Sequence, residues 1–210
     1  GDHVDLYANR GDFPDGTTGH ITQAAGGSLT VFQGMLDTSL NAYAAGSVAL
    51  NGSTVVEAGE PVSIFAGYDS PMSSSFAFAD QSIHVNSLAT SNSDVSMYAT
   101  GPISVNLTNA NTIYAEIAGA SSGGIAISHT GPTTPVSMNF FDNATSNRSV
   151  SLAHRGSDLS LNGSHGFMTG GGAVLIAAPD TALNFNGMAF NAATIQLAGG
   201  TALNMNGNLP

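Results

Sequence analysis

Asp-Leu-Ser-Leu-Asn-Gly-Ser, residues 158–164, is a short stretch of sequence that recurs with small changes along the chain. Its close copies are Ser-Val-Ala-Leu-Asn-Gly-Ser at 47–53, Ala-Leu-Asn-Phe-Asn-Gly-Met at 182–188 and Ala-Leu-Asn-Met-Asn-Gly-Asn at 202–208. Each copy places apolar residues two positions apart and then reaches Asn-Gly, which is the pattern of a strand with one buried face followed by a turn. Repetition of this kind indicates a repeat architecture.

Short alternating runs of the same type continue along the chain as two interleaved series. One series starts at positions 103, 125, 150, 174 and 195, and the other starts at positions 95, 113, 136, 159, 183 and 203. The similar steps within each series predict an all-β fold, a right-handed parallel β-helix or solenoid of about 20–25 residues per coil. An antiparallel β-sandwich, which also has many short strands, is the alternative.

The composition agrees with stacked coils. Only 3 residues are Lys or Arg and 14 are Asp or Glu, so 8% of the chain is charged, against about 25% in an ordinary domain. Strands in successive coils lie about 4.8 Å apart, so a charge repeated in every coil would repel its copies along the whole column. Uncharged Ser, Thr and Asn suit the outward positions, and Gly, Asn and Asp suit the tight turns at the corners.

The first part of the chain has a different pattern. Residues 1–27 hold several Asp and show little alternation, which predicts an N-terminal arm or cap, and residues 28–210 are predicted to form the β-solenoid. Within residues 28–46 the apolar positions have the spacing of an amphipathic helix. Gly34 and the β-branched start of this segment favour strands over that helix.

Charge and cysteine content argue against several classes of function. A net charge of -11 with three cations argues against nucleic-acid binding and against an anionic membrane surface, because both partners require clustered Lys and Arg. No apolar run is long enough for a transmembrane helix, so no membrane insertion is expected. The absence of Cys excludes thiol chemistry and Cys-bound zinc, and it agrees with a bacterial protein outside the cell. No signal sequence opens the chain, which is therefore expected to be a mature or excised segment.

The repeated sequence resembles the repeats of a known protein family. Val-Ala-Leu-Asn-Gly-Ser-Thr-Val at 48–55, followed by Gly-Glu-Pro-Val-Ser-Ile at 59–64, resembles the repeats of filamentous-haemagglutinin-type exoproteins and related large bacterial adhesins. The resemblance is one of pattern and covers residues 47–207. It implies a secreted right-handed β-helix that forms the shaft of a surface fibre or adhesin, and it transfers no functional residue. The Asn-Pro motif of the family's secretion domain does not occur in this sequence.

Two candidate binding sites lie near the N-terminus. Arg10-Gly11-Asp12 is the tripeptide that integrins recognise when a loop presents its guanidinium and carboxylate to the two ends of a receptor groove. A match this short carries little specificity, so an incidental turn is the favoured interpretation and receptor binding is the alternative. A solvated acidic terminus is likewise favoured over a cation site for the following group, and no metal or cofactor is predicted. The group consists of Asp2, His3, Asp5, Asp12, Asp15 and His20.

One compact group combines an acid, a base and a cation, namely His154, Arg155 and Asp158, with Asp142 and Arg148 expected one coil away. Such a group could act on a uronate sugar, but an ion pair between neighbouring turns is the favoured interpretation. Ser is too abundant for a Ser-His-Asp interpretation with His129, His154 or His165 to be specific. No catalytic residue is predicted, and the protein is not expected to be an enzyme.

The two ends of a stack of coils are rows of unpaired backbone groups that can template another chain. We therefore expect an extracellular or cell-surface structural and adhesive protein, a subunit or shaft segment of a fibre that assembles through β-edges. Its expected partners are copies of itself, joined end to end or through a strand donated by residues 1–20, and a cell-surface receptor or glycan. A β-helical protein that binds or degrades polysaccharides is the alternative.

Overall fold

The computed structural model describes residues 3–8, 19–32, 39–57, 59–67, 78–118, 123–140, 148–169, 172–188 and 190–206. These residues form twenty β-strands and no helix, so the described part of the chain offers no helix that could span a membrane. Every pairing between these strands is parallel. The prediction of an all-β chain with parallel strands is confirmed, and the antiparallel sandwich is wrong.

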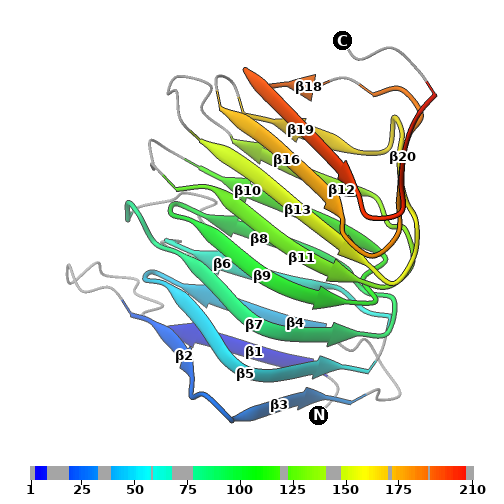
Figure 1. Cartoon of the computed structure of the whole chain (residues 1–210). Helices are drawn as coiled ribbons and strands as arrows, with labels where there is room; N and C mark the ends of the chain where they lie inside the picture. The colour runs from blue at the N-terminus through cyan, green and yellow to red at the C-terminus, as the bar shows by residue number, and fades with distance from the viewer. Residues whose placement is uncertain are drawn as a thin grey trace.

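The strands form three sheets, which we name A, B and C (Figure 1). Sheet A has eight strands in the order β1 (His3–Ala8), β4 (Ser39–Ala44), β6 (Val62–Ala66), β8 (Asp94–Ala99), β10 (Thr112–Ile117), β12 (Val136–Phe140), β15 (Gly166–Met168) and β18 (Phe190–Asn191). Sheet B has nine, in the order β2 (Ile21–Gln23), β5 (Val48–Val56), β7 (Ile83–Thr90), β9 (Ile103–Thr108), β11 (Ile125–Thr130), β13 (Ser149–Arg155), β16 (Ala173–Ala178) and β19 (Thr194–Gly199), with β3 (Ser28–Val31) also paired to β5. Sheet C consists of β14 (Leu159–Leu161), β17 (Ala182–Phe185) and β20 (Ala202–Met205).

One of the two predicted series is confirmed in sheet B. The starting residues of its five runs lie directly in register on neighbouring strands, and the first four of them are at most 1% exposed. These residues are Ile103, Ile125, Val150, Val174 and Ile195. Because inward positions coincide from strand to strand, the apolar side chains form a continuous column inside the protein.

The second predicted series is correct in its first half only. Val95, Ile113 and Val136 lie in register in sheet A, as predicted. The runs that start at positions 159, 183 and 203 instead form sheet C, because the chain adds a third strand after each of the last three strands of sheet B. Sheet A continues through β15 and β18, where Phe167 and Phe190 follow Met138 in register.

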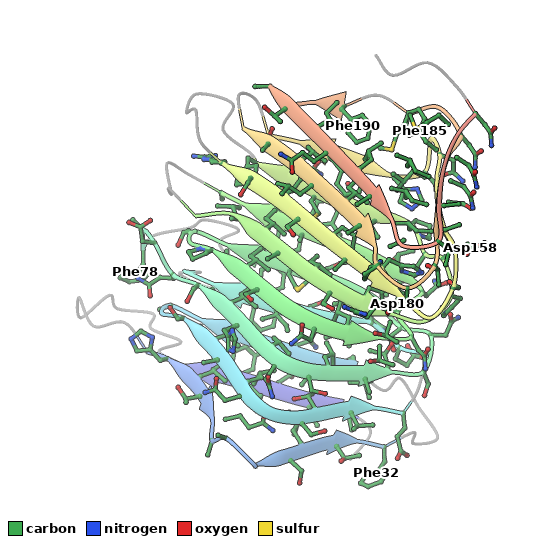
Figure 2. All side chains as sticks on the ribbon, in the orientation of Figure 1. Phe32, Phe78, Asp158, Asp180, Phe185 and Phe190 are labelled. Carbon is green, nitrogen blue, oxygen red and sulfur yellow. The ribbon has the colours of Figure 1, made fainter. Side chains whose placement is uncertain are left out.

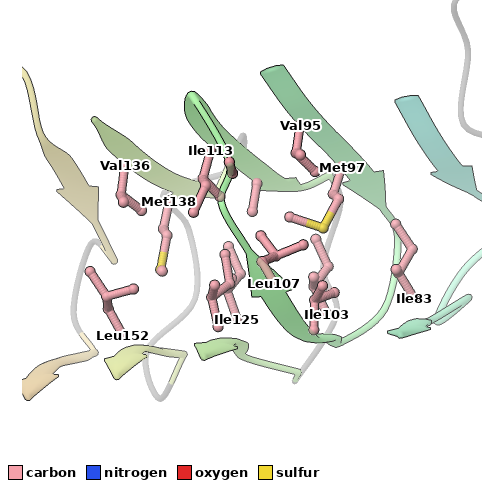
Figure 3. Packing of buried hydrophobic residues seen from close by; sticks show 14 of the residues in the cluster. Ile83, Val95, Met97, Ile103, Leu107, Ile113, Ile125, Val136, Met138 and Leu152 are labelled. Carbon is pink, nitrogen blue, oxygen red and sulfur yellow. The ribbon is translucent and has the colours of Figure 1, made fainter. Parts of the chain in front are cut away.

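The core lies between the sheets and follows the alternation of each strand. In β9, the apolar residues at positions 103, 105 and 107 are buried, and the polar residues between them are exposed. Figure 3 shows Val95 and Met97 of sheet A on one side of this core and Ile103 and Ile125 of sheet B on the other. Sheets A and B therefore bury their inner faces against each other.

The N-terminal region also contributes strands. Within residues 28–46 the structure has β3 and β4, so the preference for strands is confirmed there, and residues 33–38 lie outside the described residues. Within the segment predicted as an arm or cap, β1 pairs with β4 and β2 pairs with β5. These two strands are the first members of sheets A and B, and the domain boundary after residue 27 stays a prediction.

Strand β5 is irregular at Gly52. The register between β5 and β7 shifts between Leu50 and Ser53, and β5 pairs with β2 before this shift and with β3 after it. Ser53 N donates a hydrogen bond of 2.9 Å to Gly27 O, and Gly52 N donates one of 3.1 Å to Gln23 Oε1. A Cβ on Gly52 would lie 2.1 Å from the same Gly27 oxygen, so only glycine allows this approach of the two backbones.

Candidate functional surfaces and the open sheet edges

Most of the N-terminal candidates lie outside the described residues, so their interpretation stays a prediction. These are Asp2, Arg10, Gly11, Asp12 and Asp15. Asp5 Oδ1 accepts a hydrogen bond of 3.0 Å from Asn41 Nδ2, and His20 Nδ1 accepts one of 2.9 Å from Ser47 N. Within the described ranges, no three His, Asp or Glu residues are grouped closely enough to hold a metal ion.

The predicted group of His154, Arg155 and Asp158 does not converge on one point. Successive residues of β13 face opposite sides, so His154 is buried at 1% exposure and the Arg155 side chain is 47% exposed. Arg155 forms its ion pair with Asp180, and Asp158 Oδ1 accepts a hydrogen bond of 3.0 Å from Ala182 N. The favoured ion pair is therefore present with a different acidic partner, and its exposure makes its contribution to stability small.

Arg148 is buried rather than presented to a ligand. Its side chain is 1% exposed, and the guanidinium carbon lies 5.0 Å from the centroid of the Phe140 ring. A guanidinium over an aromatic ring makes a favourable cation–π contact. The expected partner, Asp142, lies outside the described residues. Arg148 therefore contributes to packing and does not extend a cationic surface toward an acidic sugar.

Three histidines lie inside the protein near one another. His129 and His154 are in register on β11 and β13, and their Nδ1 atoms are 3.2 Å apart. His154 Nε2 lies 3.0 Å from Ser157 Oγ, which donates a hydrogen bond of 2.8 Å to Gly131 O. His129 Nε2 is buried and has no hydrogen-bond partner. Two of the predicted runs start at positions 125 and 150, and His129 and His154 each lie four residues after one of these starts. This equal spacing is a signal in the sequence that predicts the two histidines to be neighbours.

The environment keeps these imidazoles neutral. Burial lowers the pKa of His129 to about 4, and the neighbouring His154 adds to this effect. Burial also lowers the pKa of His154, followed by repulsion from His165, and it lowers the pKa of His165 itself. His165 Nε2 donates a hydrogen bond of 3.1 Å to Thr134 O. A general base of a Ser-His-Asp triad must face a substrate, whereas these side chains face the interior.

Five aromatic side chains form a row on the outer face of sheet A. From Tyr7 through Tyr43 and Phe65 to Tyr98, neighbouring ring centroids are 5.4, 4.7 and 4.9 Å apart, with planes within 11° of parallel. Tyr114 continues the row with a ring tilted by 40°. Stacked rings cover each other's faces, and a sugar platform requires an open face. The row therefore serves to hold neighbouring strands together.

Phe65 lies in the middle of this row and offers a test of its contribution. We expect Phe65→Ala to lower the free energy of unfolding by about 2 kcal/mol, because the variant loses a stacked contact with Tyr43 and another with Tyr98. Urea unfolding followed by circular dichroism measures the change. Phe65→Tyr is the matched control, since tyrosine already occupies both neighbouring positions, and it should change stability by less than about 0.5 kcal/mol. Equal losses in the two variants would contradict a stabilising role of the stack.

The terminal strands of the sheets expose apolar side chains whose in-register neighbours on inner strands are buried. Figure 1 places β1, β2 and β3 at one end of the protein and β18, β19 and β20 at the other. Leu183 and Phe185 of β17 are fully buried, but Leu203 and Met205, in register with them on β20, are 46% and 41% exposed. At the opposite end, Ile21 of β2 is only partly buried although Val48, in register with it, is 0% exposed, and Phe32 directly after β3 is 62% exposed and projects away from the sheets (Figure 2). Apolar side chains are therefore exposed at both ends, although Val31 of β3 is buried.

The terminal strands also lack the residues that usually protect a sheet edge. Natural edges are protected from pairing with another chain by charged side chains, proline, bulges or very short strands. Of these protections, β2 and β18 have only short length, with three and two residues. In this protein β2, β3, β18, β19 and β20 contain no charged residue and no proline, and β1 contains one acidic residue, Asp5. These six strands, which we call the end strands, are the surface with the clearest capacity for binding.

No protein-family model matches the chain, and comparisons with curated proteins and with solved structures give no match. The resemblance to filamentous-haemagglutinin-type repeats therefore stays a prediction from the sequence pattern. A function for this protein has to be inferred from the geometry of its sheets and their ends.

Proposed function

We propose that this chain is an extracellular structural and adhesive protein, a subunit or shaft segment of a surface fibre that assembles through its β-edges. The observation that supports the proposal most directly is the pair of open ends, where end strands that carry a single acidic residue, Asp5, leave apolar side chains such as Leu203 and Met205 exposed. An unprotected edge is a template for another strand, so an edge of this kind is expected to be used in assembly.

The fibre proposal includes a winding of the chain as a right-handed parallel β-helix. From β13 onward the chain enters sheets B, C and A in turn, and each strand joins its sheet beside the previous strand of that sheet. From Ile83 to Ile195, in-register residues of sheet B recur at steps close to the expected length of one coil. Connections between parallel strands of one sheet are right-handed in about 98% of cases, which supports that hand.

The outer surface suits a shaft better than a reaction site. Polar side chains bond to their equivalents on the neighbouring strand, as where Asn204 Nδ2 donates a hydrogen bond of 2.7 Å to Asn184 Oδ1. Such ladders of identical residues add to the stability of stacked parallel strands. The described cations that could have met a uronate substrate, Arg148 and Arg155, are instead engaged in packing on Phe140 and in the ion pair with Asp180.

Electron microscopy of the purified chain tests this proposal. Negative staining is expected to show rods or filaments that lengthen as the protein concentration rises. Incubation of the same sample with a panel of acidic and neutral polysaccharides is expected to release no reducing ends. Single particles of constant size at every concentration would contradict assembly, and release of reducing ends would support the polysaccharide-degrading alternative instead.

A further inference from the structure

The open edge of β19 presents its backbone groups in a defined pattern. Along a strand, the N–H and C=O groups of successive residues point alternately to the two sides. Gly200 N, directly after β19, donates a hydrogen bond of 2.7 Å to Ala178 O of β16, so the even-numbered residues of this segment bond to β16. The backbone groups of Ile195 and Leu197 therefore point away from β16 and toward the open edge.

The open edge of β2 presents the complementary pattern. Ile21 N donates a hydrogen bond of 3.1 Å to Ser47 O, so the backbone groups of Ile21 point into its own sheet. Those of Thr22 point to the open edge. If Ile195 of one copy lay beside Ile21 of another, the outward C=O of Ile195 would accept a hydrogen bond from the outward N–H of Thr22. The two edges therefore match in a parallel, in-register pairing.

The side chains match in the same register. Ile21 and Ile195 are the two terminal members of one inward-facing column of sheet B, and both are only partly buried. All six members between them are at most 1% exposed, namely Val48, Ile83, Ile103, Ile125, Val150 and Val174. A second copy stacked at either end would bury the terminal isoleucine as every internal member of the column is buried.

We propose that the β19 edge of one copy binds the β2 edge of a second copy, parallel and in register, with Ile195 beside Ile21. This inference rests on the proposed fibre function and adds its partner and polarity. The partner is a second copy because each of the two edges continues the column of the other, and because neither edge carries a charge that would oppose contact between chains of net charge -11. The two patches differ, so the contact is heterologous and produces an open row of copies instead of a two-fold dimer.

Two proline variants block the two ends separately. Thr22→Pro removes an outward N–H from β2, and Ile195→Pro removes an outward N–H from β19. Neither change removes a hydrogen bond within its own sheet, and proline is tolerated on an edge strand when its nitrogen faces outward. Leu203→Asp is a second variant of the β19 end, placed on the exposed neighbour β20. The control is Leu175→Asp, an exposed leucine on β16, which is paired on both sides.

Sedimentation velocity, with circular dichroism to verify folding, distinguishes the outcomes. We expect the wild type and Leu175→Asp to form rows that grow with concentration, and Thr22→Pro, Ile195→Pro and Leu203→Asp each to sediment as single chains. An equimolar mixture of the two folded proline variants should form dimers that grow no further, because each contributes one intact end.

Other outcomes test the direction of stacking, β19 on β2, separately from the proposed fibre function. Dimers formed by Thr22→Pro alone would show that identical ends bind each other, and full rows formed by both proline variants would place the contact elsewhere. Folded proline variants that remain single chains when mixed would also overturn the stacking of β19 on β2. Each of these results leaves assembly of the wild type intact, whereas a wild type that never associates would contradict the proposed function itself.

Discussion

Replacement of Gly52 by alanine is expected to lower the free energy of unfolding by about 3 kcal/mol or more. The added Cβ would lie 2.1 Å from Gly27 O and 2.8 Å from Gly27 C, which are backbone atoms and cannot rotate away. Relief of the overlap would separate β5 from β3 and would break the 2.9 Å hydrogen bond from Ser53 N to Gly27 O. Sheet B would therefore lose part of its pairing, and urea unfolding measures the loss in stability.

Two other Asn-Gly pairs provide matched controls for Gly52. Gly163 has the same neighbours in sequence, Asn and Ser, but no atom lies within 4 Å of a Cβ at this position, so Gly163→Ala should change stability by less than about 0.5 kcal/mol. Gly187 has equally open space but a φ of +80°, so Gly187→Ala should cost about 1 kcal/mol. Similar losses in all three variants would contradict the close contact of Gly52 with Gly27.

These three glycines show how much of the local structure the repeated sequence can predict. The sequence alone predicts a turn after each strand, because Asn-Gly follows an alternating run in every copy. At Asn51-Gly52 this prediction is wrong, because both residues lie inside β5. The sequence also does not show that Gly52 lies against another segment of backbone, since this contact depends on β3, an earlier strand that belongs to no copy of the repeat. Replacement of glycine in the same local sequence is therefore expected to change stability by different amounts in different parts of the fold.

The alternation of apolar residues predicts which side chains face the core but not which sheet a strand joins. Leu159-Ser160-Leu161 has the same pattern as Val136-Ser137-Met138, yet the first run lies in sheet C and the second in sheet A. Burial acts on single residues and is visible in the local pattern, whereas sheet membership depends on the lengths of the connections. The sequence of β15, Gly-Phe-Met, has no two apolar residues two positions apart, and β18 has only two residues, so neither strand shows the alternation.

The row of stacked aromatic side chains could not be predicted from the sequence for a related reason. Tyr43 and Phe65 are in register and 22 positions apart in the sequence, but Phe65 and Tyr98 are in register and 33 positions apart. The longer connection includes residues 68–77, which lie outside the described residues. A search for one fixed period therefore misses the row, because stacking in space tolerates connections of unequal length between strands that stay in register.

Acid is expected to destabilise the protein through its three buried histidines. The unfolded chain takes up protons on His129, His154 and His165 near their ordinary pKa of about 6.5, whereas the folded state holds the pKa of each imidazole below that value. As the pH falls from above 6.5 toward the lowered pKa values of the folded state, the unfolded state therefore binds more protons, and stability falls over this range. His129, with a pKa lowered to about 4, accounts by itself for a loss of about 2 kcal/mol between pH 7.5 and pH 5.

The double variant His129→Leu/His154→Leu tests this origin of acid sensitivity. Leu88 and Leu107 precede the two histidines in the same column, so leucines at both positions would extend an existing apolar column. The variant should be at least as stable as the wild type at pH 7.5, because it also removes the buried His129 Nε2 that has no hydrogen-bond partner. Urea unfolding at pH 7.5, 6 and 5 should show most of the acid loss removed.

The matched control is His84→Leu, in which the lost imidazole lies exposed on the outer face of sheet B. This variant keeps all three buried histidines, so it should lose stability between pH 7.5 and pH 5 as the wild type does. The window stops at pH 5 because most carboxylates titrate at lower pH and would add their own effect. If the double variant loses as much stability over this range as His84→Leu does, the acid sensitivity arises outside the imidazole pair, and the interior near β11 and β13 tolerates a charge that its burial should exclude.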